Sequence, residues 1–137
     1  MTWIAVVARL ANRNSTWWLT MARLHQILNY MVEKQLDMTF TALADPTRRG
    51  MLADLMVGEK SIGELAAPYR MSFAGAAKHV AVLARADLIE RRKVGRQQLC
   101  RLKAKRLKEA NDWLKQWERF WTDRLDALEA VLKEDSE

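Results

Sequence analysis

The chain has 137 residues, 50% of them hydrophobic and 29% charged, a composition that excludes a disordered chain and suffices for a folded domain. Its net charge of +6 is uneven: residues 48–106 hold 14 Lys and Arg against 5 Asp and Glu, a local +9, whereas the rest holds 9 against 12. A basic middle favours a polyanion as the partner. The lone cysteine excludes an internal disulfide. Because the N-terminal apolar run stops at Arg9, too early for a signal peptide or a membrane span, we expect a cytoplasmic protein.

Helices are expected to dominate, because 5 Gly and 2 Pro leave little room for turns. The first long helix is predicted over residues 18–35, where four apolar residues recur at a spacing of three or four. They are Leu24, Ile27, Leu28 and Met31. The segment before it, residues 1–17, is either a short helix around residues 3–10 or an extension. A separate short helix is expected next, with Phe40 and Leu43 on one face.

A third helix is predicted to begin at Asp45, whose side chain can cap it, with Pro46 at the first helical position. We expect this helix to end at Gly58. Its predicted buried residues are Met51, Leu52, Leu55 and Met56. The adjacent arginines Arg48 and Arg49 lie in its first turn, beside the cap, and are expected to be structural.

Two short helices joined by a tight turn are predicted next, which indicates a helix-turn-helix. Ser61 and Glu64 match a capping box at the start of the first, and Pro68 stops it. The inward residues of that helix are expected to be Ile62, Leu65 and Ala66. Ser72 then caps the second helix.

The second of these helices, in the stretch SFAGAAKHVAVL, has a first turn with almost no side chain. Glycine in a helix costs about 1 kcal/mol relative to alanine, so the stretch is not optimised for helical stability. A slim leading turn instead suits a helix that enters the major groove of DNA, where its backbone must come close. Lys78 and His79 are then placed to reach the DNA backbone or base edges, while Ala76, Val80 and Leu83 are expected in the core.

Period-two alternation on both sides of Gly95 predicts a basic β-hairpin over residues 89–102, with Cys100 on the core side. A helix-turn-helix followed by such a hairpin is a winged helix.

A last helix is predicted from residue 103 to about residue 133, with a broad apolar stripe. Four of its large aromatic residues lie within three turns: Trp113, Trp117, Phe120 and Trp121. A small core cannot cover them all, so a homodimer interface is favoured over a bound hydrophobic effector.

The chain resembles the ArsR-type winged-helix transcriptional regulators, in the subgroup without metal-binding cysteines. The resemblance covers roughly residues 36–132 and rests on five segments: ALADPTRRGMLADL at 42–55, GELA at 63–66, MSFAGAAKHVAVLARADLI at 71–89, GR…CRL at 95–102 and FWTDRLDAL at 120–128. It implies a symmetric dimer that binds an operator and regulates transcription, usually as a repressor. The chain departs from the family pattern at Ala77 and Ala81, which should face DNA, and at Asp87, where a glycine is usual. Direct base readout should therefore be sparse, while Asp87 should tolerate the left-handed backbone.

These observations predict a mainly α fold with a small β-hairpin, divided into an N-terminal dimerisation segment (1–35), a winged helix-turn-helix (36–103) and a C-terminal dimerisation helix (104–137). The predicted DNA-binding residues are Ser72, Phe73, Ala74, Gly75, Ala77, Lys78, His79, Arg91, Arg92, Lys93 and Arg96. The predicted dimer interface comprises Leu24, Ile27, Leu28, Met31, Trp113, Trp117, Phe120 and Trp121.

Other functions find less support in the sequence. A metal sensor needs clustered thiolates or imidazoles, but the chain has one Cys and two His, far apart, so we expect no metal and no cofactor. No nucleophile–base pair or phosphate loop is visible, so we expect no enzyme. The main alternative is a winged-helix protein-interaction module that has lost specific DNA binding. The hairpin's charges also have a simpler explanation, since charged residues commonly protect strand edges.

Overall fold

The computed structural model describes residues 16–134, so the alternatives for residues 3–10 lie outside the described part of the chain. The chain divides into two compact units, Met1–Gln35 and Leu36–Glu137. None of the described helices is both long and apolar enough to cross a membrane.

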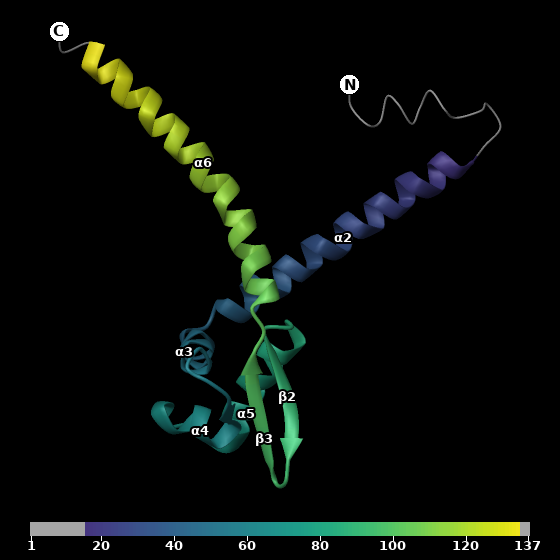
Figure 1. Cartoon of the computed structure of the whole chain (residues 1–137), viewed down its shortest axis with the longest axis vertical. Coiled ribbons are helices and arrows are strands. Elements are labelled where there is room, and N and C mark those ends of the chain that lie inside the picture. The colour runs from purple at the N-terminus through teal and green to yellow at the C-terminus, as the bar shows by residue number, and fades with distance from the viewer. Residues whose placement is uncertain (1–15, 135–137) are drawn as a thin grey trace. The chain divides into compact units, whose positions relative to one another are not determined.

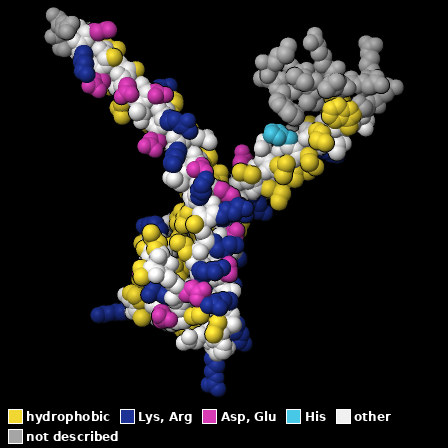
Figure 2. All heavy atoms as spheres, viewed as in Figure 1, with side chains coloured by type: hydrophobic (Ala, Val, Ile, Leu, Met, Phe, Trp, Pro, Cys, Tyr) yellow, Lys and Arg dark blue, Asp and Glu magenta, His cyan; other side chains and the backbone are white. Residues whose placement is uncertain are grey.

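The first described helix, α2, runs without a break over Trp17–Leu43. The prediction of two separate helices here was wrong, because no Gly or Pro interrupts this stretch. Towards its end, Thr39 and Ala42 are buried, whereas Phe40 and Leu43 are half-buried. The stripe predicted earlier in the helix (Leu24, Ile27, Leu28 and Met31) is more than half exposed at every position. Figure 2 shows hydrophobic side chains along the visible face of α2.

Helix α3, Pro46–Leu55, begins as predicted, with Asp45 Oδ1 accepting a 3.1 Å hydrogen bond from the Arg48 amide. Met51, Leu52 and Leu55 are buried, as expected. The prediction was wrong for Met56, which is 76% exposed because it follows the last helical turn. The helix also ends before Gly58, which lies in the turn beyond.

The helix-turn-helix is formed by α4, Ile62–Ala66, and α5, Phe73–Arg85. The predicted capping box is present, since Ser61 Oγ accepts from the Glu64 amide at 3.1 Å and Glu64 Oε1 accepts from the Ser61 amide at 3.2 Å. A 3-10 turn, η1 (Ala67–Tyr69), and left-handed Arg70 connect the two helices. Ser72 caps α5 through a 3.0 Å bond from the Gly75 amide. The inward residues of both helices are buried as predicted: Ile62, Leu65, Ala66, Ala76, Val80 and Leu83.

The predicted hairpin is present as β2, Ile89–Val94, and β3, Gln97–Leu102, which turn at Gly95 with a positive φ of 61° (Figure 1). A third strand, β1 (Lys60–Ser61), pairs with β3 and makes a three-stranded antiparallel sheet in the order β1-β3-β2. Helix α6, Lys105–Glu134, starts two residues later than expected, and Ala110 is its only buried residue among those described. The whole is a mainly helical winged helix-turn-helix, which confirms the predicted fold class.

Candidate functional site

The strand register divides the basic residues of the hairpin between its two faces. Arg91 is paired with buried Cys100 across the ladder, and Lys93 with Gln98. Because paired residues of an antiparallel sheet point to the same side and neighbours along a strand alternate, Arg91 and Lys93 share the face of Cys100. Arg92, opposite Leu99, lies on the other face. The sequence predicted one basic wing, whereas the structure has two faces with different charge environments.

On the face of Arg91 and Lys93, an open groove separates the hairpin from the helix-turn-helix. Its helical wall is largely apolar or small, and its hairpin wall is cationic and polar. The helical side is lined by Ser61, Ile62, Gly63, Phe73 and Ala77, and the hairpin side by Arg91, Lys93, Arg96, Gln97 and Gln98. The groove therefore brings together five of the predicted DNA-binding residues. Sequence reasoning did not assign the other five residues to this site: Ser61, Ile62, Gly63, Gln97 and Gln98. For Gln98, its period-two alternation with Cys100 could have indicated the shared face.

The cations of this groove have no acidic partner among the described residues. Within residues 16–134, none of Arg91, Lys93 and Arg96 takes part in an ion pair, and all three side chains are exposed. Positive charge without an internal partner is available to an external anion. This wall can therefore bind phosphate groups.

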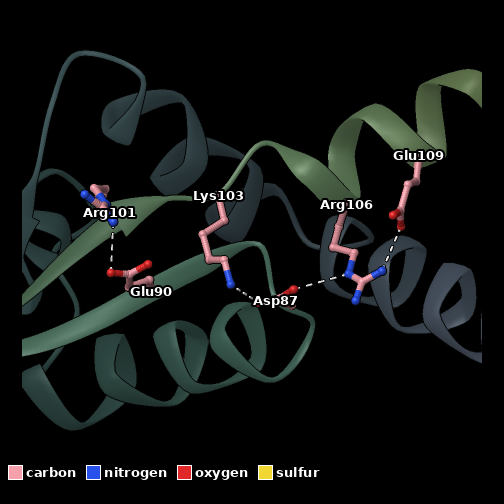
Figure 3. Close-up of polar contacts among 6 residues, drawn as sticks. All are labelled: Asp87, Glu90, Arg101, Lys103, Arg106 and Glu109. Carbon is pink, nitrogen blue, oxygen red and sulfur yellow. Dashed lines mark hydrogen bonds and ion pairs between the residues drawn. The ribbon is translucent and has the colours of Figure 1, made fainter.

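The opposite face of the hairpin carries compensated charge. Arg92 donates to Glu59 at 2.7 Å, and Arg101 donates to Glu90 at 3.0 Å (Figure 3). The hydrogen bond from Arg92 holds the pKa of the Glu59 carboxyl below its usual value, and the charges of Arg92 and Arg101 add to this effect. Figure 2 shows Lys and Arg alternating with Asp and Glu over the visible side of the hairpin. An anion approaching this face meets cations that already have partners.

Helix α5 presents few long polar side chains to solvent. Ser72, Phe73, Ala74 and Lys78 are exposed, whereas Gly75, Ala77 and His79 are half-buried. His79 lies near the start of α3, where the pKa of Asp45 is lowered mainly by its hydrogen bond from the Arg48 amide, with His79 adding a smaller electrostatic contribution. Lys78 is thus the exposed cation in the middle of this helix.

Arg48 and Arg49 serve the fold, as expected. Arg48 donates from Nε to the Ala42 carbonyl at 2.7 Å and from Nη2 to the Thr41 carbonyl at 3.0 Å. Arg49 donates to the Leu43 carbonyl at 2.9 Å. These carbonyls belong to the last turn of α2, where the regular helical hydrogen bonds end, so the two guanidinium groups link α3 to the end of α2.

Asp87 joins three elements at the base of the hairpin (Figure 3). Its backbone is left-handed, with φ of 60°, as its place at the end of α5 predicted. Its carboxylate accepts from Lys103 Nζ at 2.5 Å and from Arg106 Nε at 3.2 Å. The bond from Lys103 is the main reason that the Asp87 pKa is lowered. This junction sets the start of α6 against the hairpin.

A chain of aromatic rings runs along α6. Phe40 contacts Trp113 edge-on at 5.6 Å between centroids, and successive contacts of 5.7, 6.3 and 5.7 Å continue through Trp117 and Phe120 to Trp121. Their exposed fractions, 38% for Trp113, 50% for Trp117, 42% for Phe120 and 61% for Trp121, are large for such side chains. Exposed apolar surface of this extent is typical of a protein interface.

The described residues offer little for metal or redox chemistry. In residues 16–134, no three His, Cys, Asp or Glu side chains gather closely enough to hold a metal ion. Cys100 is buried, and this burial raises the pKa of its thiol. A thiol kept protonated in a core is a poor metal ligand and a poor nucleophile.

No family model and no curated protein matches the sequence. Solved structures do match. A crystal structure of an ArsR family transcriptional regulator has 33% identity and a TM-score of 0.62 over 66% of this chain and 93% of the other. An ArsR-like transcriptional regulator from Rhodococcus sp. RHA1 has 30% identity and a TM-score of 0.62 over 74% and 93%. A possible transcriptional regulator for arsenical resistance has 34% identity and a TM-score of 0.54 over 70% and 93%.

Proposed function

The chain belongs to the ArsR family of transcriptional regulators, and we propose that it acts as a homodimeric repressor on an inverted-repeat operator. Its structural neighbours are transcriptional regulators, which supports a role in regulation through DNA rather than in catalysis. The observation that carries the proposal is the groove between α5 and the hairpin, where an apolar helix face stands opposite unpaired cations. Duplex DNA presents both complements, base edges in its major groove and phosphates along its backbone.

Within this surface we assign two kinds of contact. Arg91, Lys93 and Arg96 bind phosphates, because their charges have no partner in the part of the chain that the structure describes. The surface that enters the major groove consists of the N-cap of α5 and the residues of its first two turns: Ser72, Phe73, Ala74, Gly75, Ala77, Lys78 and His79. We assign Arg92 a smaller contribution to DNA binding than the sequence alone suggested, because its side chain faces away from the groove and is bound to Glu59.

A second copy of the chain is the proposed cover for the exposed apolar faces. On α6 these include Trp113, Trp117, Phe120 and Trp121, and on α2 Leu24, Ile27, Leu28 and Met31. We therefore retain residues 1–35 and 104–137 as dimerisation segments on either side of the DNA-binding part. An isologous dimer places two recognition helices roughly 34 Å apart, one duplex turn, which calls for an inverted repeat.

We further propose that the regulator senses no metal, because its one cysteine is buried and, over residues 16–134, no three side chains that could bind a metal ion lie together. The decisive test is a mobility-shift titration of the purified protein with DNA upstream of its own gene, against unrelated DNA of equal length, together with sedimentation of the complex. Specific binding of two chains per site supports the proposal. Equal and weak binding of both DNAs, by a folded protein, would instead favour the alternative of a protein-interaction module.

A further inference from the structure

Phe73 is an exposed aromatic residue that does not pack against the hydrophobic core. It is the first residue of α5 and is 63% exposed. It is absent from the partly buried apolar residues that pack against the core, although its neighbours Met71 and Ala77 are among them. An exposed phenylalanine at the leading end of a recognition helix therefore needs another explanation than core packing.

The surroundings of Phe73 point to a ligand with apolar and anionic groups close together. Phe73 and Ala77, one helical turn apart, line the same wall of the groove, and Arg91, Lys93 and Arg96 line the other. Neither Phe73 nor Ala77 can donate or accept a side-chain hydrogen bond, so these two side chains cannot read the polar pattern of a base pair. In the major groove of unmodified DNA, the apolar mark on a base is the 5-methyl group of thymine.

We propose that Phe73 recognises thymine methyl groups in the major groove, so that each operator half-site requires a thymine at the position facing the start of α5. This inference rests on the proposed function, since it specifies how the same surface selects its sequence. It also accounts for Ala77, because a small residue one turn on leaves room for the base edge beside the phenyl ring. The cations opposite supply affinity without sequence preference, whereas the methyl contact supplies discrimination.

The experiment first selects binding sites from a pool of random duplexes with the wild-type protein. Each thymine of the selected half-site is then replaced in turn by deoxyuridine, which removes the methyl group and keeps the base pairing. Burying one methyl group corresponds to about a fourfold change in affinity. We expect wild type to lose about fourfold at one or two positions of the half-site, and nothing for thymines outside it.

Three variants locate the effect. Phe73→Ala should bind the thymine and deoxyuridine duplexes equally, whereas Phe73→Leu, which keeps an apolar side chain, should still distinguish them. Val57→Ala is the matched control, because Val57 is 88% exposed in the turn after α3 and does not line the groove. Its preference for thymine should equal that of wild type. All three variants should retain the wild-type melting temperature, since the substituted side chains are exposed.

Each contrary result has its own meaning. If the wild-type protein binds the selected sites specifically but loses no affinity when thymine is replaced by deoxyuridine, the methyl readout is overturned and the proposed function is not. A thymine preference that persists unchanged in Phe73→Ala also overturns it, and transfers the contact to another residue. Unchanged affinity of Phe73→Ala for every duplex overturns any contact between the phenyl ring and DNA. A selection that enriches no sequence overturns the proposed function, and the readout with it.

Discussion

Arg91 and Arg92 are adjacent on β2 but lie on opposite faces of the hairpin, so they form a matched pair for testing the DNA-binding surface. Arg91 lines the groove and has no ion-pair partner among the described residues. Arg92 is bound to Glu59 at 2.7 Å. Each substitution to alanine removes one positive charge from the same strand, so a difference between the variants reports position and not net charge.

The magnitude follows from counterion release. Each phosphate neutralised by a side chain contributes about 0.9 to the slope of log K against log salt concentration. When the salt concentration rises fourfold, from about 50 to 200 mM, both proteins should lose affinity for DNA. The loss should be about 3.5-fold larger for wild type than for Arg91→Ala if one Arg91 side chain contacts a phosphate. With both protomers on the site, this factor becomes about 12. Arg92→Ala should keep the slope within about 0.3 of wild type.

The assay is fluorescence anisotropy with a labelled operator duplex and with an unrelated duplex, at four salt concentrations. Arg91→Ala should weaken both duplexes together, because phosphate contacts carry no sequence information. The reasoning is refuted if Arg92→Ala lowers the slope as much as Arg91→Ala does. It is also refuted if Arg91→Ala weakens only the operator at an unchanged slope, because Arg91 would then contact bases.

Three further substitutions test the fold and the assembly. Gly50→Ala should lower the free energy of unfolding by about 1–2 kcal/mol in urea titrations, because a Cβ there would overlap the Tyr69 hydroxyl and displace the ring. Asp87→Asn should lower stability at neutral pH. The Asp87 pKa is below its ordinary value of 3.8 in the folded state. The difference in free energy of unfolding between wild type and Asp87→Asn should therefore be full above pH 3.8 and vanish as the pH falls through the lowered pKa of the folded state. The double variant Trp117→Ala, Trp121→Ala should sediment as a monomer at micromolar concentration, since truncating a large interface aromatic commonly costs more than about 2 kcal/mol.

Each of these substitutions has a control on the same chain. Gly63→Ala should not destabilise, because its Cβ would meet only Ser61 Oγ at an ordinary 3.9 Å. Lys103→Ala should reproduce the pH dependence of Asp87→Asn, and a difference that survives at low pH would show that the carboxylate charge is not responsible. Lys115→Ala should remain as dimeric as wild type. Lys115 lies two residues before Trp117, which places it about 200° around α6 and therefore on another face of the helix. A dimeric tryptophan variant would place the interface elsewhere.

Local signals were sufficient for much of the fold. The caps at Asp45, Ser61 and Ser72 are hydrogen bonds within four residues, so the side chains that form them are visible in the sequence. Helical spacing likewise placed Val80 and Leu83 in the core. These features depend on neighbours along the chain, and they were predicted correctly.

Features that depend on distant segments were missed. Strand β1 has two residues, too few for a period-two pattern, and exists because β3 offers it an edge. The continuity of α2 was missed for a different reason, because the absence of Gly and Pro from residues 17–43 is a local signal that was not used. The partner of Arg92 is Glu59, which lies 33 positions earlier, so no local pattern distinguishes Arg92 from Arg91.

The division of charge in the hairpin bears on how a regulator with so few polar groups on its recognition helix can select a site. Lys78 is the exposed cation in the middle of α5, and Ala77 and Ala81 offer no hydrogen bonds. If the cations of both hairpin faces bound phosphates, non-specific affinity would rise for every sequence equally and selectivity would not. Pairing Arg92 with Glu59 and Arg101 with Glu90 restricts the free cations to the wall that faces α5. In the proposed homodimer, phosphate contacts would be made where α5 is inserted, so that weak apolar contacts with the bases, doubled by the two-fold axis, would suffice to select the site.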